Sequence, residues 1–276
     1  MNDTRDPQDA KPTRSDVDDV ADASFGVDTR IFRTVWDTFI FTPRVVEAAF
    51  SGDRKTYVPI IRLFLVLFGA QFAMMAFLGL PVGVTLDALE TTPDMARAME
   101  SWLAEAGRSY DEVNRALEQA AALTTTPLTF IASAMYILLL KAYRPQRSFF
   151  GHALAYLAPV NASYIALFIC IGIWFAAGFA LGFSQEMMMA GFVFALTLSL
   201  VWYFVAAGRV IARFYAKSVI VTILQVLGLF LMLIPMLIVL VIGQYGVAEI
   251  VLRAGFDLSL GDLFLASVEA PEGNAP

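Results

Sequence analysis

Five apolar segments, each long enough to cross a lipid bilayer, constrain the fold of this chain more than any other feature. A bilayer core is about 30 Å thick, and an α-helix crosses it with roughly 20 residues at about 1.5 Å each. The segments are about 58–80, 127–143, 153–183, 187–207 and 218–243. Apolar residues make up 58% of the chain and its mean hydropathy is +0.67, which excludes an ordinary soluble domain. The sequence therefore predicts an all-α polytopic membrane protein.

The distribution of positive charge predicts the orientation of these segments. Segments 30–62, 141–152 and 208–217 carry most of the 19 lysine and arginine residues, whereas 244–276 carries only Arg253. Because loops rich in lysine and arginine stay in the cytoplasm, we expect the N-terminus inside and the C-terminus outside. The N-terminal residues lack an apolar signal core and are rich in aspartate, which favours the bacterial inner membrane over secretion or mitochondrial import.

The residues before the first crossing divide into a tail and a surface segment. Residues 1–29 carry eight aspartates and few large apolar side chains, and are predicted to be a disordered cytoplasmic tail. Residues 30–56 are predicted to form interfacial amphipathic helices. The apolar face of the first helix comprises Ile31, Phe32, Val35, Trp36, Phe39 and Ile40. Thr42 as an N-cap, followed by Pro43 in the first turn, predicts the start of a second helix, which Gly52 would end.

The predicted membrane domain, residues 57–243, carries an acidic outer loop at 85–125. Helix-start signals at Thr92 and Ser109 predict a helical hairpin within this loop. Its first helix has an apolar stripe that its own neighbours, the bilayer or another protein would cover. The tail, 244–276, is amphipathic and is expected along the outer interface.

Cations at the start of the first crossing form the preferred candidate site. Arg54, Lys55 and Arg62 would bind an anionic lipid head group at the inner leaflet, with Tyr57 and Trp36 as interfacial aromatics. The alternative is that Arg62 extends to the phosphate layer without any specific role.

His152, the single histidine, lies beside cytoplasmic arginines and is a possible pH switch or an interfacial structural residue. With one histidine and one cysteine, no metal site is expected. Polar groups within the crossings serve either as contacts between helices or as the lining of a polar path. They are Gln71, Asn161, Ser163, Tyr164 and Gln225.

Small residues recur at every fourth position in the third crossing, which lets two helix backbones approach closely. They are Gly172, Ala176 and Ala180, with Gly178 and Gly182 as a second row. They would serve internal packing or a homo-oligomer interface. Pro235 predicts a kink in the last crossing.

The residues required by familiar enzymes are missing. The chain has no GxSxG, HExxH, GxxxxGK[ST], GxGxxG or CxxCH motif. We therefore expect no enzymatic activity and no cofactor. The net charge of −6 argues against nucleic-acid binding.

The stretch RTVWDTFIFTPRVVEAAFSGDRKTYVPIIRLFLVL at 33–67 resembles a bacterial family of uncharacterised polytopic membrane proteins with an RTLxDLxxxPGxVxxxYxxGxRxxYxPPxRLYL-like motif. FFGHALAY at 149–156 and YFVAAGRVIARFYAKSVIVTIL at 203–224 resemble two of its later segments. That family often carries an N-terminal zinc ribbon, which residues 1–29 lack because they contain no cysteine. The resemblance implies an architecture and no reaction. The layout is more loosely similar to the Yip membrane-trafficking family. Matching positions are Arg33, Thr34, Trp36, Asp37, Pro43, Val46, Gly52, Arg54, Tyr57, Pro59, Arg62 and Leu63.

Three functions remain open from the sequence. The first is a non-enzymatic scaffold, assembly factor or accessory subunit that binds membrane lipids and other membrane subunits or a second copy. The second is a small-molecule or lipid transporter or channel, and the third is a lipid- or pH-responsive sensor.

Overall fold

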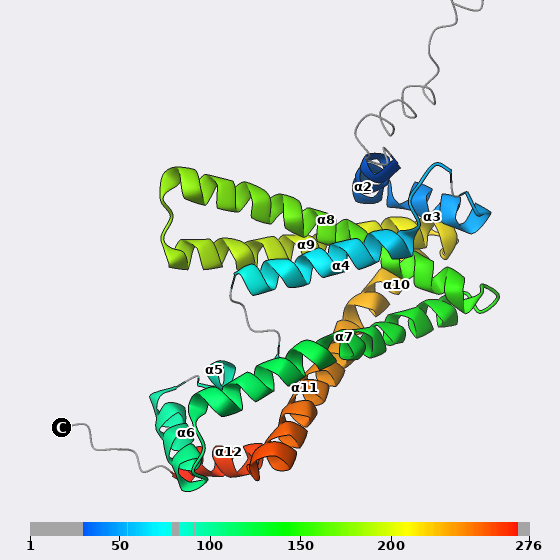
Figure 1. Ribbon diagram of the computed structural model, residues 1–276. Coiled ribbons are helices and arrows are strands. Elements are labelled where there is room, and N and C mark those ends of the chain that lie inside the picture. The colour runs from blue at the N-terminus through cyan, green and yellow to red at the C-terminus, as the bar shows by residue number, and fades with distance from the viewer. Residues whose placement is uncertain (1–29, 54, 79–82, 91, 270–276) are drawn as a thin grey trace, which may run out of the picture. The chain divides into compact units, whose positions relative to one another are not determined.

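The computed structural model describes residues 30–53, 55–78, 83–90 and 92–269, in which helices and their connecting turns account for the fold (Figure 1). The predicted tail, 1–29, lies outside the described residues. The helices are α2 (Arg30–Ile40), α3 (Thr42–Ser51), α4 (Ile60–Phe77), α5 (Leu86–Leu89), α6 (Pro93–Glu105), α7 (Tyr110–Tyr143), α8 (Phe149–Leu181), α9 (Gln185–Phe214), α10 (Val219–Leu231), α11 (Leu233–Phe256) and α12 (Leu260–Glu269).

Among the described residues, five helical segments are long and apolar enough to cross a membrane, which confirms the predicted all-α class and is compatible with a multi-pass membrane protein. They are α4, α7, α8, α9 and the stretch Val219–Phe256 that comprises α10 and α11. The described residues divide into two compact units, one within 30–67 and 150–222 and the other within 68–149 and 223–269.

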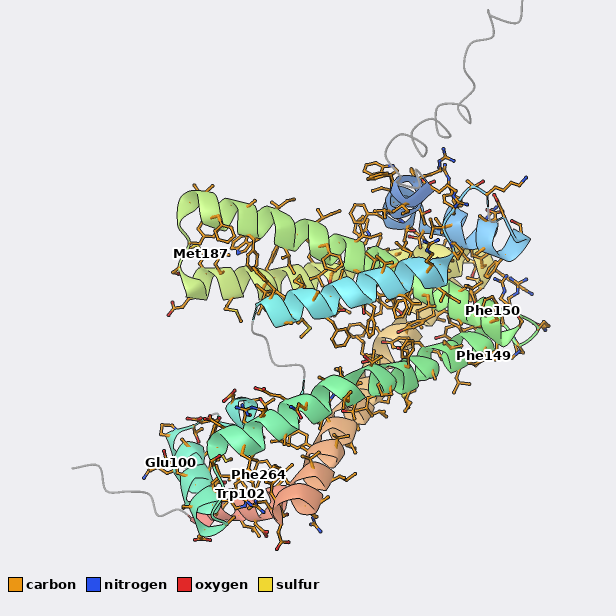
Figure 2. The ribbon with its side chains drawn as sticks, viewed as in Figure 1. Glu100, Trp102, Phe149, Phe150, Met187 and Phe264 are labelled. Atoms are coloured by element: carbon orange, nitrogen blue, oxygen red, sulfur yellow. The ribbon has the colours of Figure 1, made fainter. Side chains whose placement is uncertain are left out.

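Helices α8 and α9 form the centre of the first unit and lie side by side, with Phe150 and Met187 at opposite ends of the pair (Figures 1 and 2). Gly182 turns the chain between them at φ 68°, a conformation that glycine adopts without steric cost. Phe183 N–H donates to the Gly178 carbonyl at 3.0 Å, which closes the end of α8. The two helices approach closely along this pair. The indole of Trp174 on α8 occupies the space that a Cβ on Gly191 of α9 would need.

Helix α2 buries a polar face and exposes an apolar one. Thr34 and Thr38 are buried, whereas Phe32 and Trp36 are 69% and 62% exposed. The Thr34 hydroxyl donates to the Arg30 carbonyl at 2.6 Å, within the helix, whereas the buried Thr38 hydroxyl has no hydrogen-bond partner in the described structure. The predicted N-cap of α3 is wrong: Thr42 lies inside the helix and donates to the Thr38 carbonyl, while Gly52 ends α3 as predicted.

The second unit shows that the predicted hairpin and the second crossing share one helix. Helix α7 begins at the predicted cap, where the Ser109 hydroxyl accepts from Glu112 N–H at 3.3 Å. It then continues through Pro127 to Tyr143 without a break. Thr124 and Thr125 each donate to the carbonyl four residues earlier, so their hydroxyls do not disrupt the helix.

Helix α11 packs along α7, and it is separated from α10 close to Pro235, where the sequence predicts a kink. Met232 alone lies between the two helices, three residues before the proline. Gly243 of α11 lies against the Leu128 side chain, and Gln244 Nε2 donates to Thr125 Oγ1 at 2.8 Å. The fifth helical segment runs on to Phe256, beyond its predicted end at 243.

A helical cap with its own apolar core completes the second unit. It combines α5, α6, the first turns of α7, the end of α11 and α12, and its core includes Met99, Trp102, Leu117, Leu252 and Leu263. The apolar stripe of α6 is thus covered by neighbours within the chain, with Trp102 of α6 and Phe264 of α12 in the same region of the cap (Figure 2).

Candidate functional site

Helices α2 and α3 are fixed to the last turns of α9 and form the part of the first unit that we call the collar, residues 30–51. Trp202 Nε1 donates to the Phe39 carbonyl at 3.2 Å, and Arg209 donates to the Ile40 carbonyl at 2.9 Å. These carbonyls end α2, where backbone acceptors lack partners within the helix. The ring of Phe39 stacks on Trp202 with centroids 4.7 Å apart. The collar is therefore held by hydrogen bonds that favour one docking position.

The loop between α3 and α4 is tied back to α2. The Tyr57 hydroxyl donates to Asp37 Oδ2 at 2.7 Å, and Val58 N–H donates to Thr34 Oγ1 at 2.9 Å. Partial burial, followed by this hydrogen bond, raises the pKa of Tyr57 to about 12. At neutral pH the phenol is therefore uncharged and remains a donor.

Asp53 forms the turn that enters this loop. Its Oδ1 accepts from Lys55 N–H at 2.9 Å and from Thr56 N–H at 3.1 Å. Hydrogen bonds from Thr56, and then from Lys55, lower the pKa of the Asp53 carboxyl. The side chain is fully ionised at neutral pH.

An apolar pocket of about 250 Å³ lies beside this loop. Its walls come from α3, the loop, and the first turns of α4 and α8. The lining residues are Val45, Ala49, Gly52, Asp53, Tyr57, Val58, Pro59, Ile60, Ile61, Phe150 and Leu154. Only Asp53 among them carries a charge.

The five residues of the predicted lipid site do not all line one pocket. Tyr57 lines it. Lys55 and Arg62 are exposed and are close in sequence to lining residues, and Trp36 is exposed on α2. Arg54 lies outside the described residues. Sequence analysis did not identify the roles of Asp53 in the lining and Asp37 as the partner of Tyr57. For Asp53, the available signal was its residue type, because an aspartate side chain accepts hydrogen bonds from the backbone two residues further on and so forms a turn.

The predicted switch residue His152 is buried in the first unit. Its Nδ1 lies 2.8 Å from the hydroxyl of Tyr215, the residue that ends α9. Both side chains are less than a tenth exposed. The contact joins the start of α8 to the end of α9, a structural role that the sequence left open beside the switch.

The small residues of α8 divide into two groups. Gly178 is buried against Met188 of α9, and Gly182 is the turn residue described above. Gly172, Ala176 and Ala180 are exposed, and nothing lies within 4 Å of a Cβ built on Gly172. Of the three glycines, only Gly178 is in close contact with another helix of its unit.

Polar side chains of the crossing helices contact neighbouring helices within each unit. Asn161 Nδ2 donates to the Ile60 carbonyl at 3.0 Å, and Tyr164 packs near Phe64 with ring centroids 6.3 Å apart. In the second unit, the backbone carbonyl of Gln225 accepts from the Tyr143 hydroxyl at 2.9 Å. Two buried amide oxygens, Asn161 Oδ1 and Gln225 Oε1, have no hydrogen-bond partner in the described structure.

Among the described residues, no group of three or more histidine, cysteine, aspartate or glutamate side chains could hold a metal ion. Comparisons of the chain with protein-family models, with curated proteins and with solved structures found no match in any of the three.

Proposed function

We propose that this chain is a non-enzymatic scaffold of the bacterial inner membrane, acting as an assembly factor or accessory subunit of a membrane complex. The docked collar is the observation that carries the proposal. A helix whose apolar side chains point outward, while its carbonyl end is hydrogen-bonded to a crossing helix, offers a rigid surface to lipid or to another subunit.

The distribution of charge in the first unit supports the proposed orientation, with the N-terminus in the cytoplasm and the C-terminus outside. Glu186 begins α9, whereas Arg209 and Arg213 lie in its last turns, beside the collar. The described cations of this unit lie on α2, on α3, around the start of α4 or at the end of α9. Such a cationic end favours the cytoplasmic surface.

Partner recovery tests the scaffold. The tagged protein would be extracted with native lipids into nanodiscs, and every co-purifying protein identified by mass spectrometry. We expect other membrane subunits in fixed proportion to the chain. A second sample, carrying Trp36→Ala and Phe32→Ala, keeps the threonine face and should lose partners that dock on α2. Recovery of the chain alone, together with substrate flux through purified protein in vesicles, would replace this proposal with the transporter.

Labelling tests the orientation. In a Cys170→Ser background, Ser51→Cys on α3 and Ser101→Cys on α6 place single thiols at exposed positions. A maleimide that cannot cross membranes should react with Ser101→Cys from the outside of spheroplasts, and with Ser51→Cys only after lysis. The reverse pattern would contradict the proposed orientation.

A second role, lipid binding at the collar, is favoured by the exposed aromatic face of α2 and its flanking cations Arg30 and Arg33. Peptides are unsuitable because the collar depends on α9, so the full chain is tested in nanodiscs. Fluorescence from Trp36, isolated as the difference between wild type and Trp36→Phe, should shift to the blue when phosphatidylglycerol replaces phosphatidylcholine. An unchanged spectrum would count against this role.

A further inference from the structure

The pocket beside the loop opens where two crossing helices of the first unit begin. Ile61 of α4 and Phe150 of α8 line it and are 38% and 59% exposed. Helix ends of this kind lie where hydrocarbon meets lipid head groups. A molecule in the pocket would therefore be continuous with the surrounding lipid.

The polar groups of the lining favour a cation. The Tyr57 hydroxyl already donates to Asp37, which leaves Asp53 as the polar group that can bind a ligand. Asp53 Oδ1 accepts two backbone N–H groups, and the Thr56 side chain also bonds to this carboxylate. Asp53 is exposed, and the two oxygens of a carboxylate offer about four acceptor sites, so it can still bind a ligand donor. An ionised carboxylate beside two aromatic rings, those of Tyr57 and Phe150, is suited to an ammonium group and repels an unaccompanied phosphate.

Cations lie directly beyond this carboxylate in the chain. Lys55 follows Asp53 by two residues, Arg62 follows Ile61, and both cations are exposed. An anion in the pocket, with exposed cations adjoining the lining residues in the chain, is complementary to a head group that carries an ammonium and a phosphate in series.

We propose that this pocket binds one phospholipid whose head group carries a cationic amine. The ammonium pairs with Asp53, the phosphate faces Lys55 and Arg62, and the adjoining apolar part of the lipid packs against Val45, Ala49 and Leu154. This assignment deepens the lipid-binding role above and rests on the interfacial placement of the collar.

Competition between two lipids tests the proposal. The full chain is purified from nanodiscs that contain phosphatidylethanolamine and phosphatidylglycerol in equal amounts with identical acyl chains. Native mass spectrometry then counts the lipids that stay bound. We expect about threefold enrichment of phosphatidylethanolamine, the effect of one exposed ion pair.

Matched variants assign that preference to the pocket. Asp53→Asn keeps the Oδ1 acceptor of the turn and should abolish the enrichment, whereas Glu186→Gln, at the far end of α9, removes one acid and should preserve it. Ala49→Phe fills the pocket and should reduce retention of the amine lipid. Three results would overturn the proposal: equal retention of the two lipids by the wild type, a preference of the wild type for phosphatidylglycerol, or unchanged enrichment of phosphatidylethanolamine in Asp53→Asn. The Trp36 difference spectrum described above reports the interfacial placement of the collar separately, so a failure of that placement is distinguishable.

Discussion

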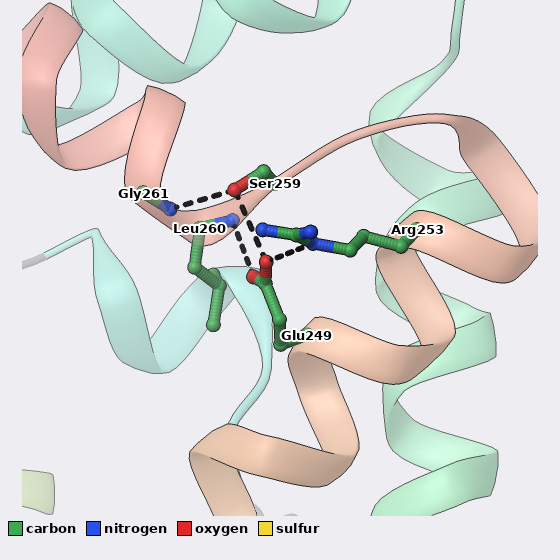
Figure 3. A network of polar contacts seen from close by, with 5 residues as sticks. All are labelled: Glu249, Arg253, Ser259, Leu260 and Gly261. Carbon is green, nitrogen blue, oxygen red and sulfur yellow. Dashed lines mark hydrogen bonds and ion pairs between the residues drawn. The ribbon is translucent and has the colours of Figure 1, made fainter.

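Replacing Glu249 by alanine tests how the last helix is fastened to the cap. The carboxylate of Glu249, on α11, accepts from Leu260 N–H at 2.8 Å and from Ser259 Oγ at 3.1 Å, and it pairs with Arg253 (Figure 3). Leu260 begins α12, so Glu249 satisfies a backbone donor that α12 itself cannot satisfy. The carboxylate also lies at the positive end of the α12 dipole.

The magnitude follows from these contacts. Loss of a helix-capping acceptor costs about 0.5–2 kcal/mol. The Arg253 side chain is 69% exposed, so its ion pair adds little. We take about 1.4 kcal/mol for Glu249→Ala, which is roughly a tenfold change in the local opening equilibrium.

Hydrogen exchange of the full chain in nanodiscs measures this opening. Amides of α12 should exchange about ten times faster in Glu249→Ala, by the conversion above. Arg253→Ala keeps both bonds to the start of α12 and serves as the matched control, with a change below about twofold. Unchanged exchange in Glu249→Ala would refute the capping role. An equal increase throughout α8 and α9 would also refute it, because the effect would then be global.

Three further substitutions test separate features. Gly191→Ala should lower stability by about 1–3 kcal/mol, because a Cβ there meets the Trp174 ring. The control in thermal unfolding is Gly246→Ala, whose Cβ meets nothing within 4 Å, and equal melting temperatures would contradict the close approach of Trp174 to Gly191. The folded-state pKa of Tyr57 is raised from 10 to about 12, first by partial burial and then by the hydrogen bond to Asp37, so its contribution to stability is fully present below pH 10 and is lost as pH rises through 12. Tyr57→Phe should flatten the fall in stability across this window, and parallel curves would argue against the raised pKa. Asp257 ends α11 at φ 58°, so Asp257→Gly should stabilise the chain by about 0.5 kcal/mol, and a lower melting temperature would show that its side chain contributes more than the backbone strain costs.

Local signals in the sequence were sufficient for much of the helical pattern. Segment hydropathy predicted five crossing helices, and residues such as Ser109 and Gly52 predicted where α7 begins and α3 ends. These features depend on a few neighbouring residues, so they can be read along the chain. The continuation of α7 through Pro127 could not be predicted in this way. A proline after three threonines indicates an interruption of the helix as long as the residues that pack against it are unknown.

The candidate site was predictable only in part. Tyr57 was identified as an interfacial aromatic, but its partner Asp37 lies 20 residues earlier, and Trp202 reaches Phe39 across 163 residues. Tryptophan and arginine in a membrane helix are equally suited to contact lipid head groups. The sequence alone therefore could not show that Trp202 and Arg209 contact the end of α2.

The sequence by itself determined that this chain is a multi-pass helical protein, because hydropathy and helix length are summed over consecutive residues. Only the tertiary structure decided that α2 buries its threonines, that Asp53 lines an apolar pocket and that Glu249 of α11 caps the start of α12. Each of these depends on which distant groups meet, and a hydrogen bond or a pocket exists only once the chain has brought its two sides together.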